Sequence, residues 1–140
     1  MLPWLQRLFR RNKDTSDWAM SVGQENGETV VLRTRSRPPT GMDPNAYPHA
    51  VELIWRFDGA ATAGMPTPEV HQLLMDCEGL LQILEGSAIG MLGLSITGNG
   101  RREWVWYVSD PDVFAREVEE LLSASRRSFP LEVRAVRSSS

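Results

Sequence analysis

The feature that most constrains this chain is a tight turn, Gly98-Asn99-Gly100, which leads into its most aromatic stretch. Glycine and asparagine tolerate positive φ angles, so their presence between two apolar runs predicts a β-hairpin. After the turn, side chains alternate between the two sides of the predicted strand, which places Trp104 and Trp106 on one face. Two indole rings need a thick apolar cover. We therefore expect this hairpin to be the central pair of an antiparallel sheet that packs against helices.

Other strands follow from the same alternation of side chains. The run before the turn, residues 89–96, predicts a strand with Leu92, Leu94 and Ile96 on one face. Further strands are predicted at residues 17–22, 28–36, 48–57 and 129–136.

Two segments have helical periodicity and similar start signals. The first begins at Thr67 and Pro68, which suit the N-cap and the first helical position, and its apolar residues recur at three- and four-residue steps to Glu85. The second begins at residues 110–112, Asp-Pro-Asp, and fades near Ser123.

The order of these elements predicts the fold class. From Pro48 onward the order is strand, helix, strand, strand, helix, strand, the split β-α-β arrangement of ferredoxin-like folds. We therefore predict an α+β fold: a ferredoxin-like β-α-β-β-α-β sandwich with both helices on one sheet face, an added N-terminal β-hairpin and a short N-terminal amphipathic helix. The predicted organisation is an amphipathic segment and linker at 1–16, a single α+β domain at 17–137 and a disordered tail at 138–140.

The N-terminal segment has two open interpretations. Over residues 3–11, a helix would place Trp4, Leu5, Leu8 and Phe9 on one face beside several arginines. Such a helix could contact a membrane surface as a peripheral anchor, or it could pack on its own domain. Its apolar residues precede its basic ones, the reverse of the order in a secretory signal.

Cysteine content and hydropathy bear on the compartment. Cys77 is the single cysteine, so no internal disulfide is possible, which fits a reducing compartment. No apolar run is long enough to span a bilayer. We expect a cytoplasmic protein, with peripheral contact to the inner membrane left open through the N-terminal segment.

Charge and motifs argue against several functions. The net charge is −3, and residues 1–13 contain four basic residues and no acidic one, so the remainder is clearly acidic, which disfavours nucleic-acid binding. The small-residue loop at 58–66 has no Gly-Lys-Ser/Thr ending, so we expect no nucleotide site. His49 and His71 lie in different predicted elements, and we expect no metal and no cofactor.

Two neighbouring residues of the first predicted helix, Cys77 and Glu78, are candidates for a chemical role. Cys77 belongs to the apolar stripe of the helix and is most simply a small core residue. Glu78 lies on the flank of that stripe. It could pair with an arginine, although a surface glutamate is the simplest interpretation. Because no set of nucleophile, base and orienting group is evident, a non-catalytic role is favoured over an enzyme.

The remaining candidates are binding residues: Arg33, Arg35, Arg101, Glu103 and Tyr107. We expect them to lie on the sheet face that the helices leave open, although a solvated edge strand is the simpler interpretation of arginines in line. The favoured hypothesis is a protein-binding or regulatory module whose partner is another protein. The alternatives are a small-molecule-binding protein or an enzyme of unknown class, and an RNA-binding module that stacks bases on Tyr107.

Several residues, in their order along the chain, resemble a known family. They are Trp18, Gly27, Arg33, the strand from Tyr47 to Trp55, Met65-Pro66-Thr67, Glu78, Thr97-Gly98, Arg102-Glu103-Trp104 and Tyr107. Over residues 17–136 the chain resembles the bacterial domain of unknown function 695 family, although it lacks an Asp-Pro-x-Trp segment near its end. The resemblance implies a ferredoxin-like relative of the inhibitory protein B that regulates ribonuclease E. The family has no established activity, so the resemblance implies a fold and leaves the function open.

Overall fold

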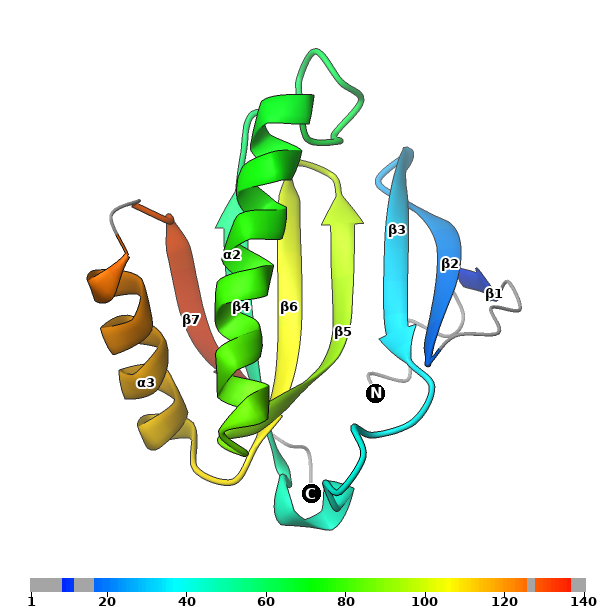
Figure 1. Cartoon of the computed structure of the whole chain (residues 1–140). Helices are drawn as coiled ribbons and strands as arrows, with labels where there is room; N and C mark the ends of the chain where they lie inside the picture. Colours follow the sequence, from blue (N-terminus) through cyan, green and yellow to red (C-terminus); the bar gives the residue numbers. More distant parts are fainter. Residues whose placement is uncertain (1–8, 12–16, 126–127, 137–140) are drawn as a thin grey trace.

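The computed structural model describes residues 9–11, 17–125 and 128–136, which form a seven-stranded antiparallel sheet and two α-helices. Across the sheet the strands follow the order β1-β2-β3-β5-β6-β4-β7 (Figure 1). The strands are β1 (Phe9–Arg11), β2 (Trp18–Glu25), β3 (Glu28–Arg35), β4 (His49–Arg56), β5 (Gly90–Gly98), β6 (Arg101–Val108) and β7 (Leu131–Val136). The helices are α2 (Pro68–Gly86), α3 (Pro111–Ala124) and the short 3-10 helix η1 (Pro44–Ala46).

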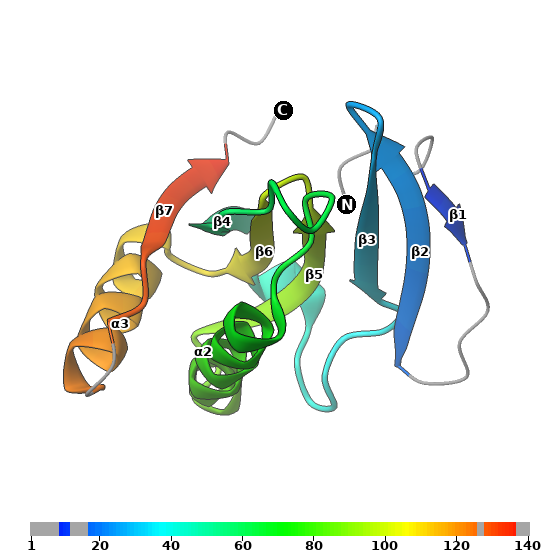
Figure 2. The same ribbon diagram turned by 90° about the horizontal axis from the view of Figure 1, so that it is seen from above.

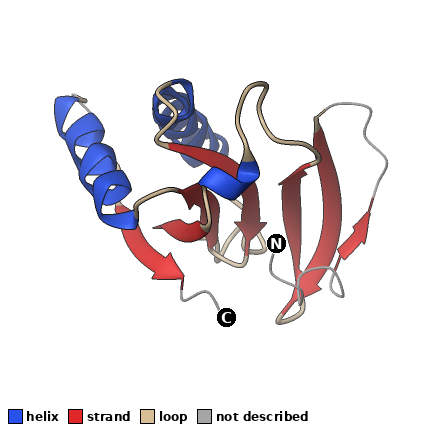
Figure 3. Cartoon of the chain, turned by 90° about the horizontal axis from the view of Figure 1, so that it is seen from below, coloured by secondary structure: helices blue, strands red, loops and turns tan. Residues whose placement is uncertain are grey.

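Both α-helices lie on one face of the sheet (Figures 2 and 3). Helix α2 contacts β5 and α3, and α3 contacts β4. Neither helix crosses β2 or β3, because this hairpin continues the sheet beyond the helical layer (Figure 1). The α+β class and the placement of both helices on one face are confirmed.

The helix starts follow the sequence signals closely. The Thr67 side chain accepts a hydrogen bond from the backbone N–H of Val70 at 3.3 Å, and Pro68 takes the first helical position. At α3, the Asp110 carboxylate accepts from the backbone N–H groups of Asp112 and Val113 at 2.9 and 3.3 Å. These bonds satisfy backbone donors that the first turn of a helix leaves without partners.

The β5–β6 hairpin is central, as the sequence predicts. Its turn residues Asn99 and Gly100 have φ angles of 53° and 78°, which explains why these residue types stand there. Trp104 and Trp106 are fully buried in the layer between the sheet and the helices. The core of this layer also contains leucines of α2, Phe114 of α3 and apolar residues of β4.

One face assignment is wrong because β5 is interrupted by a β-bulge at Gly93. Leu92 pairs with Trp106 and therefore faces the helices, whereas Leu94 pairs with Val105 on the opposite face. The bulge inserts one residue into β5, which shifts the alternation of side chains by one position. The aromatic ring of Tyr107 packs over Gly93, where an added Cβ would lie 2.2 Å from the ring.

The predicted N-terminal helix is wrong for the part that the structure describes. Residues 9–11, which include Phe9, form β1 and pair antiparallel with β2. Trp4, Leu5 and Leu8 lie outside the described residues, as do the predicted linker at 12–16 and the predicted tail at 138–140. Within the described ranges, no helix is both long enough and apolar enough to cross a membrane.

Candidate functional site

The β2–β3 hairpin and α2 form a corner on the helical side of the sheet. The hairpin pairs with β5 through β3, and α2 packs on β5, so the sheet runs out from under the helix (Figure 1). On this side of β2, Met20 and Val22 are 42% and 45% exposed, although both are apolar. The corner is therefore an accessible surface with apolar and charged components.

A pocket of about 260 Å³ lies in this corner, and we call it the methionine pocket. Its apolar lining consists of Met20, Val31, Met65, Pro66 and Met75. Its polar lining consists of Arg33, His71, Ser95, Thr97 and Arg102. These residues come from two strands of the hairpin, the two central strands, α2 and the loop before α2.

A buried ion pair lies beneath this pocket. Arg102 and Glu78 are 6% and 8% exposed, and Arg102 Nη2 donates to Glu78 Oε1 at 2.8 Å. The same carboxylate oxygen accepts from Trp104 Nε1 at 2.7 Å, and Arg102 Nη1 donates to Thr97 Oγ1 at 2.8 Å. Charge-assisted hydrogen bonds of this kind hold the arginine in one position.

Arg33 stands at the rim of the pocket with a loosely held guanidinium. Its Nη1 lies 4.0 Å from Glu78 Oε2, and its guanidinium carbon lies 4.6 Å from the centre of the Trp18 ring. The Arg33 side chain is 36% exposed. The Arg33 guanidinium is therefore held by a cation–π contact with Trp18 and by one long contact with a carboxylate.

The loop at residues 57–67 places Met65 and Pro66 over the pocket. The backbone N–H of Gly100 donates to the carbonyl of Gly64 at 2.9 Å, which fixes the loop against the β5–β6 turn. Gly64 has φ +86°, and a Cβ there would lie 2.8 Å from the backbone nitrogen of Asn99. Only glycine fits this approach, so the Gly64-Met65-Pro66 segment supplies both the contact and the pocket wall.

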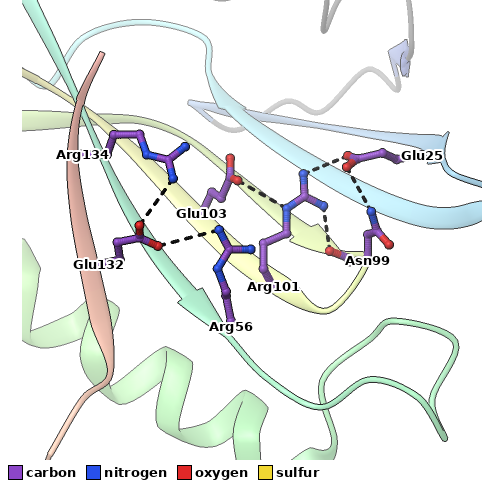
Figure 4. Close-up of polar contacts among 8 residues, drawn as sticks. Glu25, Arg56, Asn99, Arg101, Glu103, Glu132 and Arg134 are labelled. Atoms are coloured by element: carbon purple, nitrogen blue, oxygen red, sulfur yellow. Dashed lines mark hydrogen bonds and ion pairs between the residues drawn. The ribbon is translucent and has the colours of Figure 1, made fainter.

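The second face of the sheet, opposite the helices, carries a separate set of charges (Figure 4). Arg101 donates to Glu25 Oε2 at 2.8 Å, to the Gly98 carbonyl at 2.7 Å and to Glu103 Oε1 at 3.5 Å. Asn99 donates to the other oxygen of Glu25 at 3.1 Å. Arg101 is only 8% exposed, so it ties the β5–β6 turn to β2.

Burial also governs the other polar groups of the second face. It raises the pKa of the Tyr107 hydroxyl, which keeps that group protonated at neutral pH. Burial, followed by the negative charge of Glu103, raises the pKa of the Glu52 carboxyl. Next to these groups, Val30, Leu32, Leu94, Ile96 and Val105 form a buried aliphatic cluster.

A second pocket of about 300 Å³ lies where β3 and β5 separate near the loop that contains η1. Arg35, Arg37, Tyr47 and Tyr107 are among the residues that line it. Each of its guanidinium groups already has a carboxylate: Arg35 pairs with Glu85 at 3.0 Å and Arg37 pairs with Asp17 at 3.3 Å. Its positive charges are therefore balanced within the chain.

The structure separates the five residues that the sequence offers as one binding surface. Arg101, Glu103 and Tyr107 lie on the second face, whereas Arg33 and Arg35 point to the helical side, toward Glu78 and Glu85 of α2. The expectation that all five share the open face is wrong. Strand alternation shows which side chains of β3 share a face. Which of the two faces lies on the helical side depends on how β3 pairs with β5.

The sequence interpretation missed the central role of Glu78. It is buried beneath the methionine pocket instead of lying on the surface, and it pairs with Arg102, as one of the two interpretations proposed. A signal was present in the chain. Arg33, Met65-Pro66, Thr97 and Arg102, which carry the family resemblance, line this pocket. Trp18, Glu78 and Trp104 contact its charged groups.

The remaining candidate groups are separate from one another. Cys77 is a buried core residue, and burial, followed by the charge of Glu78, raises the pKa of its thiol to about 12. His49 starts β4 and His71 lies on α2 at the pocket rim. Over residues 9–11, 17–125 and 128–136, no three His, Cys, Asp or Glu side chains gather into a metal-binding group.

Comparison with known proteins gives one family. The model of a family described as "Family of unknown function (DUF695)" matches residues 16–139. Comparison with curated proteins gives no match, and comparison with solved structures gives none either.

Proposed function

The chain belongs to the family of unknown function DUF695, and we propose that it is a non-catalytic binding module that holds another protein in the methionine pocket. The observation that carries this proposal is the combination of a buried, fixed guanidinium in the floor of the pocket with flexible methionine walls. Methionine adapts its shape to a partner and recurs at binding surfaces that accept varied sequences.

The chemistry of the buried groups supports binding over catalysis. The thiolate is the nucleophilic form of cysteine, and a pKa of about 12 keeps the Cys77 thiol protonated at neutral pH. Glu78 accepts hydrogen bonds from Arg102 and Trp104 through one oxygen, so its charge serves to hold those side chains. A role as a fixed anchor accounts for each of these contacts.

A comparison of the two faces of the sheet favours the helical side as the binding surface, because its side chains are more accessible. The Arg101 side chain on the second face is 9% exposed, and it is occupied by Glu25, Glu103 and a backbone carbonyl. By contrast, Arg33 and Met20 in the corner beside α2 are exposed and adjacent to a hollow. A partner that contacts Arg33 and Met20 would disturb only the long, 4.0 Å contact between Arg33 and Glu78.

We further propose that the unit from β4 to β7 is ferredoxin-like. Support comes from the order β7-β4-β6-β5 across this part of the sheet and from the two helices that connect β4 to β5 and β6 to β7 on one face. The hairpin β2–β3 is then an extension beside β5. Similarity to the inhibitory protein B of ribonuclease E stays a prediction, as does a cytoplasmic location.

Affinity capture from lysate of the native host tests the proposed function. The tagged chain is compared with the variants Met20→Asp and Val22→Asp, each purified and shown to be folded. Met20 lines the pocket, whereas Val22 is equally exposed on the same side of β2 and does not line it. We expect Met20→Asp to lose a stoichiometric partner that Val22→Asp retains.

Two outcomes would contradict the proposal. Equal recovery of the same partner by all three forms would show that the pocket plays no part in binding. Loss of the partner with Val22→Asp alone would move the binding surface away from the pocket.

A small-molecule role is the second candidate, favoured by the modest pocket volume of about 260 Å³. It predicts that no protein is recovered by any of the three forms.

A further inference from the structure

We propose that the methionine pocket recognises a carboxylate attached to an apolar group. This inference rests on the proposed function, because it names the chemistry by which that pocket holds its partner.

The charges around the pocket do not balance. Among the residues that the structure describes, Arg33 and Arg102 supply two positive charges, and Glu78, the carboxylate that both of them contact, supplies one negative charge, so these three side chains carry one positive charge in excess. In the neighbouring pocket, Arg35 and Arg37 each have a carboxylate of their own. By this balance of charge, the methionine pocket is the better candidate of the two for binding an anion.

Hydrogen-bonding capacity leads to the same ligand class. Arginine carries five N–H donors and no acceptor. Arg102 is 6% exposed and lines the pocket, and its buried Nε has no partner among the residues that the structure describes, as is also true of Arg35 Nε in the neighbouring pocket. Arg33 approaches Glu78 only to 4.0 Å. Donors exceed acceptors, so a ligand that brings acceptor oxygens complements the site, and a carboxylate fits a guanidinium in its plane.

The walls specify what the carboxylate must be attached to. Met20, Met65 and Met75 surround the polar floor with thioether side chains that can enclose an apolar group. A volume of about 260 Å³ holds roughly nine groups of the size of water, at about 30 Å³ each. A short aliphatic acid has these dimensions, and so does the last residue of a peptide that ends in leucine.

Binding of hexanoate and of its neutral amide, hexanamide, tests the inference. Both are titrated into the full chain and followed by two-dimensional NMR of the methionine methyl groups. We expect hexanoate to bind in the millimolar range, as a ligand of this size allows, and to shift Met20, Met65 and Met75. Hexanamide, which lacks the charge, should bind more weakly than hexanoate by a factor of about ten or more.

Arginine variants test which side chain of the pocket interacts with the negative charge of the ligand. Arg33→Ala should weaken hexanoate binding about tenfold and leave hexanamide binding unchanged. Arg56→Ala is the matched control, because Arg56 is an exposed arginine of β4 that pairs with Glu132 on the second face. Equal affinities of the wild-type chain for the acid and the amide would overturn the inference. Equal effects of the two arginine variants would do the same.

A peptide arm separates the two sources of such a carboxylate. Acetyl-Ala-Ala-Leu with a free C-terminus is compared with the same peptide as its amide. Tighter binding of the peptide acid than of hexanoate assigns the ligand to a protein terminus, and tighter binding of hexanoate assigns it to a free acid. Because the capture experiment uses no carboxylate probe, it can succeed while this inference fails, and the two proposals are judged separately.

Discussion

Replacing Glu78 with alanine should destabilise the fold by about 3–5 kcal/mol, because it leaves Arg102 charged and buried without its carboxylate. Trp104 Nε1 loses its acceptor in the same step. Equilibrium unfolding in urea, followed by tryptophan fluorescence, measures this loss as a shift of the midpoint. Gln82→Ala, an exposed change on the same helix, should stay within about 0.5 kcal/mol of the wild-type chain.

A double variant distinguishes the unpaired charge from a simple loss of packing. Adding Arg102→Met to Glu78→Ala removes the stranded guanidinium and should recover much of the lost stability, because a buried ion pair can often be replaced by apolar side chains. Additive losses for the two changes would show that Glu78 and Arg102 do not act as a pair.

The two buried indoles should respond differently to replacement by phenylalanine. Trp104 and Trp106 are both fully buried on the same face of β6. Trp104 Nε1 donates to the Glu78 carboxylate at 2.7 Å, whereas Trp106 Nε1 has no partner among the described residues. Trp104→Phe should therefore cost about 1.5–3 kcal/mol more than Trp106→Phe, the contribution of a hydrogen bond to a charged group.

Because the two substitutions remove similar volumes, each serves as the control of the other. Urea denaturation with an unchanged slope would attribute the difference to stability alone. Equal losses in the two variants would mean that the Trp104–Glu78 bond contributes nothing beyond packing. A larger loss for Trp106→Phe would contradict the assignment of the polar cluster to Trp104.

The elements that the sequence predicted correctly are those with local signals. The Asn99-Gly100 turn and the two Pro-containing helix starts depend on backbone preferences of a few adjacent residues, so they could be read without tertiary information. The burial of Trp104 and Trp106 followed from strand alternation, which places both indole rings on one face of β6. Two such rings on one face favour a face that is covered by other elements.

The errors concern non-local information. The bulge at Gly93 shifts the side-chain alternation of β5, so Leu94 faces the side opposite to Leu92. It is detectable only through the pairing of β5 with β6. Whether Arg33 and Arg35 face the helices depends on β3 joining β5, and the sequence left the position of that hairpin open. Residues 9–11 pair with β2 as a strand although their pattern favoured a helix, because pairing with a neighbour can override a weak local preference.

The candidate site was accessible to sequence reasoning only in part. The family resemblance already contained Arg33, Glu78, Thr97 and Arg102, but nothing local indicated that four separate elements would bring them together. The contribution of the methionines was hidden for a different reason. An apolar residue at alternate positions is normally interpreted as core, and Met20 is exposed because α2 does not extend over β2.

We propose that a partner binds in the corner between α2 and the β2–β3 hairpin. The most direct test is photocrosslinking in the native host with a photoreactive phenylalanine analogue placed at position 20 or at position 56. Met20 is exposed in that corner, and Arg56 is exposed on the second face. We predict a crosslinked product of defined mass from position 20 and none from position 56. A product from position 56 alone would contradict the claim and return the binding site to the second face.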